Sequence, residues 1–176
     1  MRRKINTTVT ILGGGPSAQP WIGKVTSPVI GVNQAALYQK VDWCIWNDRQ
    51  WYLKWGEEVK RTGAELWSTT TGYPPEVNIL NVETKSSGAS AIFLALWLGY
   101  KEIHLIGYDF QSQNGQPNFH KDYNRVTHEK AWYQRHWLPD FQKIAQYANR
   151  NGIKILNLNP QSKLTVFPFL EQLTTL

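Results

Sequence analysis

Hydrophobic positions are densest in one helix-and-strand unit in the middle of the chain. Residues 88–99 are apolar at almost every position, so they predict a helix that other elements cover on all sides. Gly99 is suited to end this helix in a left-handed conformation. Residues 102–106 predict a short buried strand. Residues 107–109 follow its carboxyl end, which is the edge at which open α/β sheets bind ligands.

Other apolar runs alternate with polar or amphipathic segments. They predict strands over residues 7–12, 28–32, 42–46, 64–68, 77–82 and 153–158, and a helix over residues 49–62. A last helix is expected from about Leu138 to Arg150, because Pro139 favours a first turn; a continuous helix kinked at Pro139 is the alternative. Strands that alternate with helices form parallel sheets. We therefore expect a single α/β domain over residues 1–176, with a Rossmann-like, mostly parallel sheet and helices on both faces.

Composition indicates a folded, cytoplasmic protein. Hydrophobic residues make up 41% of the 176 residues, which excludes a disordered chain and is enough for a core. Cys44 is the single cysteine, so no internal disulfide is expected and a reducing cytoplasm fits best. We expect neither a signal peptide nor a membrane span, because residues 5–12 are too short and too polar for either.

The net charge of +6 suits an anionic ligand or nucleic acid. Lys and Arg are scattered along the sequence rather than grouped into a stripe, so a charge that only maintains solubility is the alternative. The sequence also leaves a homo-oligomer open.

A glycine turn follows the first predicted strand directly and contains Gly13, Gly14, Gly15, Pro16 and Ser17. Without side chains, such a turn lets backbone N–H groups approach a phosphate, so it is a candidate nucleotide-binding element. It is not a Walker A loop, since no Gly-Lys-Ser/Thr follows, and it is not a complete G-x-G-x-x-G pattern. A plain tight turn is the alternative.

The two ends of the central unit carry the clearest binding chemistry. Ser86, Ser87 and Gly88 can cap the helix, and the N–H groups at this positive end favour an anion such as a phosphate. Asp109 is expected to face the same crevice, where its carboxylate can bind a ribose hydroxyl or a base amine, or orient an acceptor. Capping of a following helix is the ordinary role of such an Asp.

Amide residues follow several of the predicted strands. The small residues of the glycine turn follow the first strand, and Asn33 and Asn47 come after the second and third strands; Asn159 lies at the carboxyl edge of the last one. Any single Asn is more often a helix cap. Because parallel strands end at one edge, their recurrence favours a shared ligand site.

Metal and nucleophilic chemistry have little support. No H-E-x-x-H or D-x-D pattern occurs, so no metal site is expected, and Cys44 within a strand is an inert buried thiol by default. A general base is expected among His120, His128 and His136, which lie in or beside the polar segment before the last helix. His104 within a strand is expected to be an ordinary sheet residue.

Residues 86–110 resemble the central motif of the bacterial sialyltransferases of glycosyltransferase family 42. The resemblance rests on Ser-Ser-Gly before an apolar helix and on Leu-Gly-Tyr-Lys-Glu-Ile-His-Leu-Ile-Gly-Tyr-Asp-Phe at positions 98–110. The stretch is also similar to the wider DUF115 group, which includes archaeal 6-hydroxymethylpterin diphosphokinases. Residues 13–17, 32–34, 46–47 and 159–162 match in order and rough spacing.

This resemblance implies a metal-independent transferase that uses a CMP-sugar and requires no other cofactor. The positions that resemble the family's nucleotide-binding residues are Asn33, Asn47, Ser86, Ser87, Gly88 and Asp109. The family's catalytic base is a histidine shortly before the last helix; His136 keeps that distance best, with His128 next. The chain departs from the family at Gly14, where an Asn is usual, and at Gln111 and Phe119, where tyrosines that hold the phosphate are usual.

The favoured hypothesis is therefore a nucleotide-sugar-dependent glycosyltransferase with catalytic residues among His136, His128 and Asp109. Its acceptor is a glycan, a small metabolite or a hydroxylated base in DNA, and the compact chain is typical of a phage or small bacterial version. Two alternatives stay open. One is a non-catalytic module that binds a nucleotide or nucleic acid, and the other is a pterin or nucleotide diphosphokinase that needs Mg²⁺ and ATP.

Overall fold

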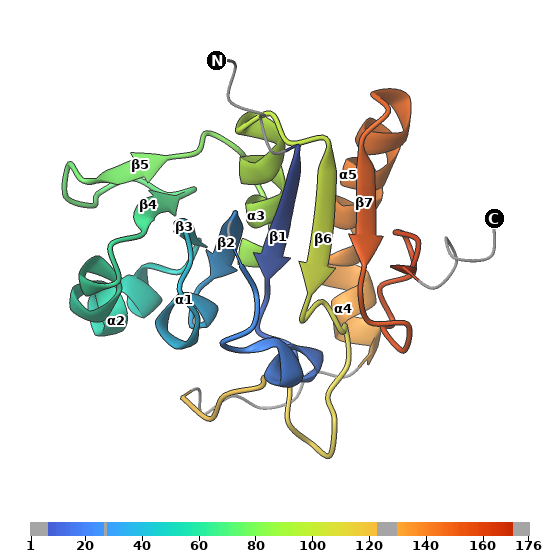
Figure 1. The fold of residues 1–176 in the computed structure, drawn as a ribbon, viewed down its shortest axis with the longest axis horizontal. Helices are drawn as coiled ribbons and strands as arrows, with labels where there is room; N and C mark the ends of the chain where they lie inside the picture. The colour runs from blue at the N-terminus through green and yellow to red at the C-terminus, as the bar shows by residue number, and fades with distance from the viewer. Residues whose placement is uncertain (1–6, 27, 123–129, 171–176) are drawn as a thin grey trace.

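The protein folds around one parallel β-sheet, seen in a computed structural model that describes residues 7–26, 28–122 and 130–170. The strands are β1 (Thr8–Leu12), β2 (Val29–Val32), β3 (Trp43–Trp46), β4 (Glu65–Ser68), β5 (Val77–Ile79), β6 (Glu102–Ile106) and β7 (Lys154–Asn157). They lie in the order β5-β4-β3-β2-β1-β6-β7, and every neighbouring pair is parallel (Figure 1). The expected Rossmann-like α/β fold is confirmed.

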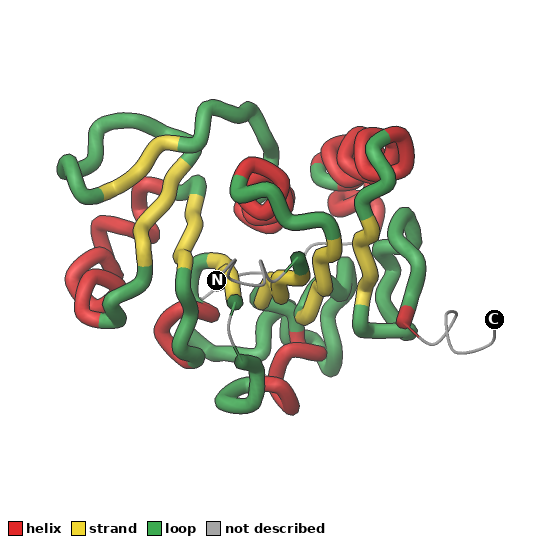
Figure 2. The backbone as a smooth tube through the Cα atoms, turned by 45° about the horizontal axis from the view of Figure 1, so that its top comes forward, coloured by secondary structure: helices red, strands yellow, loops and turns green. Residues whose placement is uncertain are grey.

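Helices cover both faces of the sheet, as expected. The helices α3 (Ser87–Trp97) and α5 (Leu138–Arg150) pack together on one face, and α3 lies against β1, β2 and β3. On the other face α1 (Ala35–Tyr38) packs on β2 and α2 (Arg49–Arg61) packs on β3. Figure 2 shows the strands between these two groups of helices.

The alternation of side chains along β1 explains the two cores. Val9 and Ile11 point into the cluster beneath α3 and α5, whereas Leu12 belongs to the cluster on the opposite face. Successive residues of a strand point to opposite faces, so a strand covered on both sides is apolar on both. This is why the predicted strands read as continuous apolar runs.

Three short elements were not anticipated from the pattern. The 3₁₀-helix η1 (Pro16–Trp21) follows the glycine turn, α1 has a single turn, and α4 (Lys130–His136) precedes α5. The break between α4 and α5 lies at Trp137, and Pro139 stands in the first turn of α5, which confirms the predicted start over the kinked alternative.

The central helix differs from the expectation in one respect. Ser86 caps α3 and Gly99 ends it with φ of +87°, as expected, but α3 is not covered on every side. Trp97 is 64% exposed, and Phe93 and Leu96 are only partly buried. The reason is that α5 covers only one flank of α3.

The chain reverses direction across the sheet between β1 and β6. Strands β1 to β5 step outward to one edge, and α3 then carries the chain back across β3, β2 and β1 to β6 (Figure 1). The carboxyl ends of β1 and β6 therefore form the topological switch point, where doubly wound sheets bind ligands.

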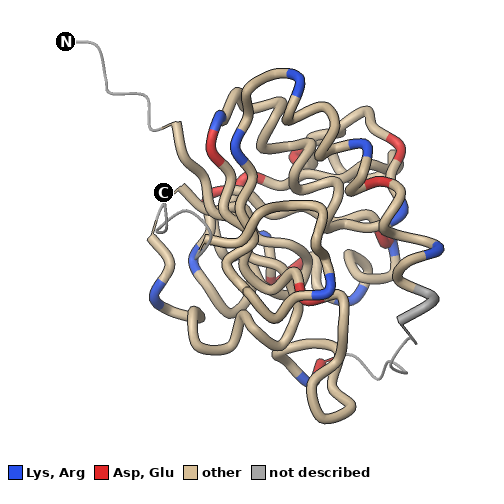
Figure 3. The backbone as a smooth tube through the Cα atoms, turned by 90° about the vertical axis from the view of Figure 1, so that its right-hand side faces the viewer, with Lys and Arg blue, Asp and Glu red and all other residues tan. Residues whose placement is uncertain are grey.

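The charged residues do not form a single patch in the part of the chain that the structure describes. Figure 3 shows Lys and Arg positions spread over several elements, with Asp and Glu among them. Within the described ranges, no helix combines the length and apolar character needed to span a bilayer.

Candidate functional site

A pocket of about 160 Å³ lies at the switch point. Its walls come from the glycine turn (residues 13–15), the start of α3 (residues 86–88), residues 107–111 after β6, Pro117 and Asn118, and Tyr133, Trp137 and Phe141 of α4, α5 and their junction. The turn after β1, the α3 N-terminus and Asp109 therefore share one crevice, as the sequence predicted. A larger groove beside β5 is lined by Trp67, Trp97 and other uncharged side chains and lies apart from these residues.

The two turns that follow β1 and β6 are locked together by backbone contacts. The N–H of Gly13 donates to Ile106 O at 2.7 Å, and the N–H of Gly15 donates to Gly107 O at 2.9 Å. A Cβ on Gly13 would lie 2.8 Å from the Gly107 carbonyl oxygen, and one on Gly107 would lie 2.7 Å from that of Gly13. Only glycine allows this approach.

This packing changes the expected role of the glycine turn. The N–H of Gly13 bonds to the last residue of β6, that of Gly15 bonds to the first residue after β6, and that of Ser17 bonds to Asp109. Of the turn's N–H donors, only that of Gly14 has no partner among the described residues, and Pro16 has no N–H. The turn forms one wall of the pocket, and in the described structure only the Gly14 N–H is left to meet a phosphate; the predicted nucleotide contact of the turn stays a prediction.

Asp109 is the clamp that holds three segments at the switch point. It is 3% exposed, and its Oδ2 accepts the Ser17 N–H at 2.8 Å. Its Oδ1 accepts hydrogen bonds from Ser17 Oγ and from Asn159 Nδ2, the latter at 2.6 Å. The carboxylate thus ties the end of β6 to η1 and to the segment after β7. The predicted contacts of Asp109 with a nucleotide or acceptor stay a prediction.

The N-terminus of α3 presents its N–H groups to the pocket. The Ser86 side chain accepts the Ala89 N–H at 3.2 Å, which confirms the predicted cap. The N–H groups of Ser87 and Gly88 have no partner among the described residues, and both residues line the pocket. Donors at the positive end of a helix favour an anion.

Asn47 fixes the position of this helix start. Its N–H donates to Ser87 Oγ at 3.1 Å, its Nδ2 donates to Thr84 Oγ1 at 3.0 Å, and its Oδ1 accepts from Ser90 Oγ at 2.8 Å. Each polar atom of the Asn47 side chain has an internal partner, and Asn47 is not among the pocket-lining residues. The structure therefore gives Asn47 a positioning role.

Asn33 presents the opposite case. It adopts φ of +50°, a left-handed conformation that Asn tolerates better than most residues. Its Oδ1 is buried and has no hydrogen-bond partner among the described residues. Asn33 itself is not among the described pocket-lining residues, although its neighbour Val32 is, so the predicted nucleotide contact of Asn33 stays a prediction.

An aromatic wall faces the glycine turn and was not predicted as part of the site. Phe110 contacts Tyr133, Trp137 and Phe141, with ring centroids 5.7, 6.1 and 5.3 Å apart. The last three recur every four residues, so one stripe of the α4–α5 segment was readable in the sequence. Phe110 has φ of +53°, an outlier for an aromatic residue, of a kind that clusters at functional sites.

Tyr108 connects the turn after β6 to α3. Its hydroxyl donates to Gly88 O at 2.9 Å, and its ring lies 3.2 Å from where a Cβ of Gly88 would be. Burial raises the pKa of Tyr108, so the phenol stays protonated and keeps this hydrogen bond at any physiological pH.

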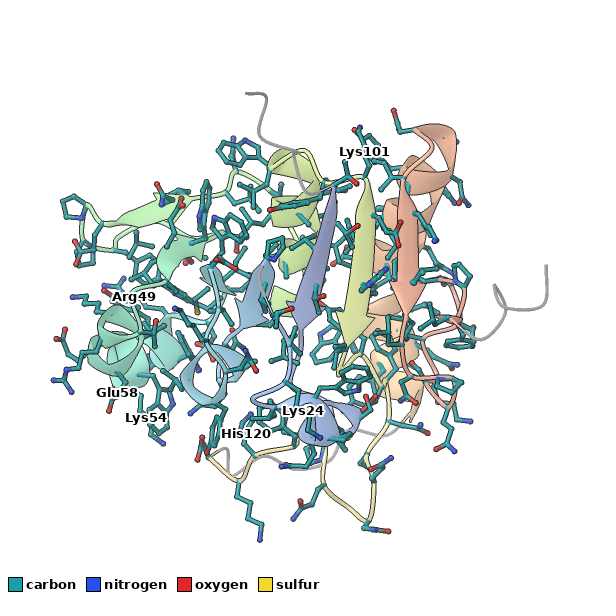
Figure 4. The ribbon with its side chains drawn as sticks, viewed as in Figure 1. Lys24, Arg49, Lys54, Glu58, Lys101 and His120 are labelled. Carbon is teal, nitrogen blue, oxygen red and sulfur yellow. The ribbon has the colours of Figure 1, made fainter. Side chains whose placement is uncertain are left out.

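The histidines differ in how they relate to the pocket. His136 ends α4 with an exposed side chain and is not among the pocket-lining residues, although its neighbour Trp137 is. His128 lies outside the described residues. His120, labelled in Figure 4, is buried and stacks on Tyr38 of α1, and its Nδ1 accepts the Asp122 N–H at 3.3 Å. His104 pairs with Glu102 in the sheet, 2.8 Å between Nε2 and Oε1.

The segment after Asp109 is fastened over the carboxyl edge of the sheet. The Phe119 N–H donates to Gly14 O at 2.9 Å, and Asp122 Oδ2 accepts from Gln34 Nε2 at 2.6 Å and Tyr38 OH at 2.9 Å. The hydrogen bond to Asp122 raises the pKa of Tyr38. These contacts place Pro117 and Asn118 at the pocket.

The pocket carries little charge. Among the described residues that line it, Asp109 is the only Asp, Glu, Lys, Arg or His. No group of three His, Cys, Asp or Glu residues in the described part of the chain is placed to hold a metal ion. The electrostatics of the described pocket therefore come mainly from the α3 N-terminus and from aromatic faces.

The fold is similar to two solved sialyltransferases of Campylobacter jejuni. CstII, in complex with the substrate analogue CMP-3FNeuAc, matches with a TM-score of 0.60 and 18% identity over 93% of this chain and 85% of that one. The monofunctional α-2,3-sialyltransferase Cst-I matches with a TM-score of 0.63 and 17% identity over 96% of this chain and 82% of that one. Searches of protein-family models and of curated proteins found no match. At such identities the likeness shows the fold.

Proposed function

We propose that this protein is a glycosyltransferase that uses a nucleoside-monophosphate sugar of the CMP-sugar type. The observation that carries the proposal is the α3 N-terminus, whose Ser87 and Gly88 N–H groups open into a pocket with an aromatic wall at the switch point. The similarity to enzymes that include a CMP-sugar analogue complex supports the same donor class.

A donor with one phosphate suits the charge of this pocket. Two N–H groups and the helix dipole can stabilise one phosphodiester, which carries a single negative charge. A pyrophosphate carries more charge and usually meets a divalent cation or several Lys and Arg side chains. The described lining contains one carboxylate, that of Asp109, and no Lys or Arg side chain. A donor with a single phosphate therefore fits this lining better than a pyrophosphate donor.

The aromatic wall supplies the other half of donor recognition. The rings of Tyr133 and Trp137 line the pocket, and a base or a sugar ring can pack against aromatic ring atoms of this kind. The Oδ1 of Asn33 has no hydrogen-bond partner among the described residues, and a turn of this side chain toward the pocket would let it accept a hydrogen bond from a base amine or a ribose hydroxyl. Both groups favour an uncharged ring beside the phosphate.

The transfer itself needs a nucleophile, a base and a stabilised leaving group. An acceptor hydroxyl attacks the anomeric carbon, the bond from that carbon to the phosphate oxygen breaks, and its electron pair leaves with the nucleoside monophosphate. The N–H groups of Ser87 and Gly88 stabilise the charge that develops on the phosphate. His136, next to Trp137, is the candidate base that accepts the hydroxyl proton, and His128 is the second candidate.

Titration of CMP tests the donor class through two substitutions at one position. Ser87 is the first residue of α3, where proline is tolerated, and Ser86 before it is extended (φ −145°, ψ 145°), as a residue before proline prefers. Ser87→Pro removes the N–H and the hydroxyl, whereas Ser87→Ala removes only the hydroxyl. We expect Ser87→Pro to weaken CMP binding about ten- to a hundredfold more than Ser87→Ala, because an N–H bonded to a charged group is lost.

Equal affinities in the two variants would place the phosphate elsewhere. Binding of ATP that requires Mg²⁺, without binding of CMP, would favour the diphosphokinase alternative. Circular dichroism of both variants checks that α3 is retained. For the base, His136→Ala and His128→Ala are each assayed for transfer; unchanged rates in both would refute the assignment.

A non-catalytic nucleotide-binding protein is the second candidate. The observation in its favour is that no histidine is among the described pocket-lining residues, so the described site binds without an evident proton acceptor. Transfer or hydrolysis of a bound CMP-sugar would exclude this candidate.

A further inference from the structure

A second cleft lies on the other side of the glycine turn from the nucleotide pocket. Its two parts, of about 410 and 390 Å³, lie side by side, because Pro16, Gln19 and Gln113 line both of them. Its floor is η1 and the residues that follow β6 and β7. Its outer wall is the two-residue hairpin turn between Gln113 and Gln116. We call it the amide cleft.

Amide side chains dominate the amide cleft, and no charged residue is among its described lining residues. Gln19, Gln113, Asn118 and Gln161 are examples, contributed by three separate segments. Lys24, which Figure 4 labels near η1, is not among the lining residues. An amide has both donors and an acceptor but no charge, so it complements a ligand with the same combination. Hydroxyl groups have that combination.

The side-chain amides of the outer wall are available to hydrogen-bond a ligand. The backbones of Gln113 and Gln116 bond to each other, N–H to carbonyl at 2.9 and 2.8 Å, which holds the turn rigidly. Asn114 and Gly115 take the left-handed conformations that such a turn requires, with φ of +50° and +76°. The side chains of Gln113 and Gln116 are exposed and have no hydrogen-bond partner among the described residues.

An indole completes the amide cleft. Trp21 lines it at the end of η1 and is 40% exposed. Pro16 and Pro20 stiffen η1, and Ser17 ties it to Asp109, so the indole is held on a rigid support. A fixed, exposed aromatic face beside neutral hydrogen-bonding groups matches a sugar ring, whose C–H face stacks on the indole while its hydroxyls meet the amides.

The amide cleft adjoins the nucleotide pocket at Asn118. This residue lines both cavities, and its Oδ1 lies 3.2 Å from where a Cβ of Gly14 would be. The Phe119 N–H to Gly14 carbonyl bond fixes that position. A chain of sugars in the amide cleft therefore extends toward the site at which the donor sugar would be released.

We propose that the amide cleft binds a neutral oligosaccharide and presents its end to the nucleotide pocket. Binding of the oligosaccharide is inferred from the lining of the amide cleft alone. Its role as the acceptor rests on the proposed function. Nucleic acid is disfavoured as the occupant, because phosphate contacts need Lys or Arg side chains that the described lining lacks.

The test is direct binding to immobilised glycans. The probes are neutral galactose-, glucose- and N-acetylglucosamine-containing oligosaccharides, sialylated and sulfated glycans, and single-stranded DNA. The protein is used as wild type, Trp21→Ala, Gln113→Ala and the control Trp97→Ala, an exposed tryptophan on α3 outside the amide cleft. We expect neutral oligosaccharides to bind, with affinity about tenfold weaker in Trp21→Ala, about three- to tenfold weaker in Gln113→Ala and unchanged in Trp97→Ala.

Binding of only anionic glycans or DNA, absence of glycan binding, or glycan binding unaffected by Trp21→Ala and Gln113→Ala would each overturn the proposal. CMP titration of the same variants separates the two hypotheses, since neither side chain lines the nucleotide pocket and CMP affinity should not change. If the wild type binds glycans but not CMP, the proposed donor class is wrong, whereas oligosaccharide binding in the amide cleft is supported.

Discussion

Replacing Asp109 tests whether its carboxylate organises the site or binds the ligand. Asp109→Asn keeps the size of the side chain but exchanges one acceptor oxygen for a donor N–H₂. If the remaining oxygen stays at the Oδ1 position, the new amide faces the Ser17 N–H, which now lies 2.8 Å from Oδ2. If the amide flips, it faces Asn159 Nδ2, which now lies 2.6 Å from Oδ1. Two donors meet in either orientation.

The cost follows from the hydrogen bonds that are lost. An orphaned buried donor costs about 1–3 kcal/mol, and loss of the charge weakens the bonds that remain, so we expect Asp109→Asn to lower the free energy of unfolding by about 2–4 kcal/mol. Ser17→Ala removes the hydroxyl but keeps the N–H, and should cost about 1–2 kcal/mol. The double variant should lose less than the sum, because both changes break the same Ser17 to Asp109 contact.

Urea unfolding followed by tryptophan fluorescence measures these free energies, and CMP titration measures the pocket. Ser17→Ala and Asn159→Ala are the matched controls, because their side chains touch Asp109 but do not line the nucleotide pocket. If Asp109 is a clamp, all variants lose stability and CMP affinity together. The structural role of Asp109 would be refuted by one result. In that result Asp109→Asn abolishes CMP binding but changes the free energy of unfolding by less than about 0.5 kcal/mol.

Two further predictions concern the glycine turn and the strand β6. Gly15→Ala should lower the free energy of unfolding by more than about 2 kcal/mol, because its Cβ would lie 2.6 Å from both Asp109 Oδ2 and the Gly107 carbonyl oxygen. Gly14→Ala is the control and should cost less than about 1 kcal/mol, because it meets only a side-chain oxygen at 3.2 Å; equal costs in urea unfolding would contradict this. The hydrogen bond from His104, more than the nearby Lys154, holds the pKa of Glu102 below its usual value, so its contribution to stability is present above about pH 4.5 and is lost as the pH falls through the lowered pKa. Glu102→Gln should therefore cost less than about 1 kcal/mol at pH 7 and nothing in acid, and a cost independent of pH in urea unfolding would show that the charge is irrelevant.

Local pattern was enough to predict most elements of the sheet. The strand over residues 102–106 was placed at its observed bounds, Glu102–Ile106, and Pro139 located the start of α5. These features are readable because strand and helix periodicity, caps and breakers act within a few residues of one another. The shared crevice was also predictable, since parallel strands all end at one edge.

The roles of single polar residues at that crevice were not predictable. Asn33 and Asn47 look alike in sequence. Both polar side-chain atoms of Asn47 are hydrogen-bonded, to Thr84 and Ser90, whereas the buried Oδ1 of Asn33 has no partner among the described residues. The difference depends on Thr84 and Ser90, which only the crossover of α3 brings to the end of β3. The spacing of residues along the sequence therefore could not predict which of the two Asn side chains is hydrogen-bonded.

What the sequence alone determined about this protein is the alternation of strands and helices, the parallel α/β class and the segments that meet at the ligand edge. Only the tertiary structure decided which donors reach which acceptors. Asp109 is bonded to Ser17 and Asn159, which are 92 and 50 positions away in the chain. The amide cleft likewise joins η1 to the segments after β6 and β7. Hydrogen bonds and cavities form between whichever groups the packed sheet brings within about 3 Å, and that proximity is a property of the fold rather than of any segment.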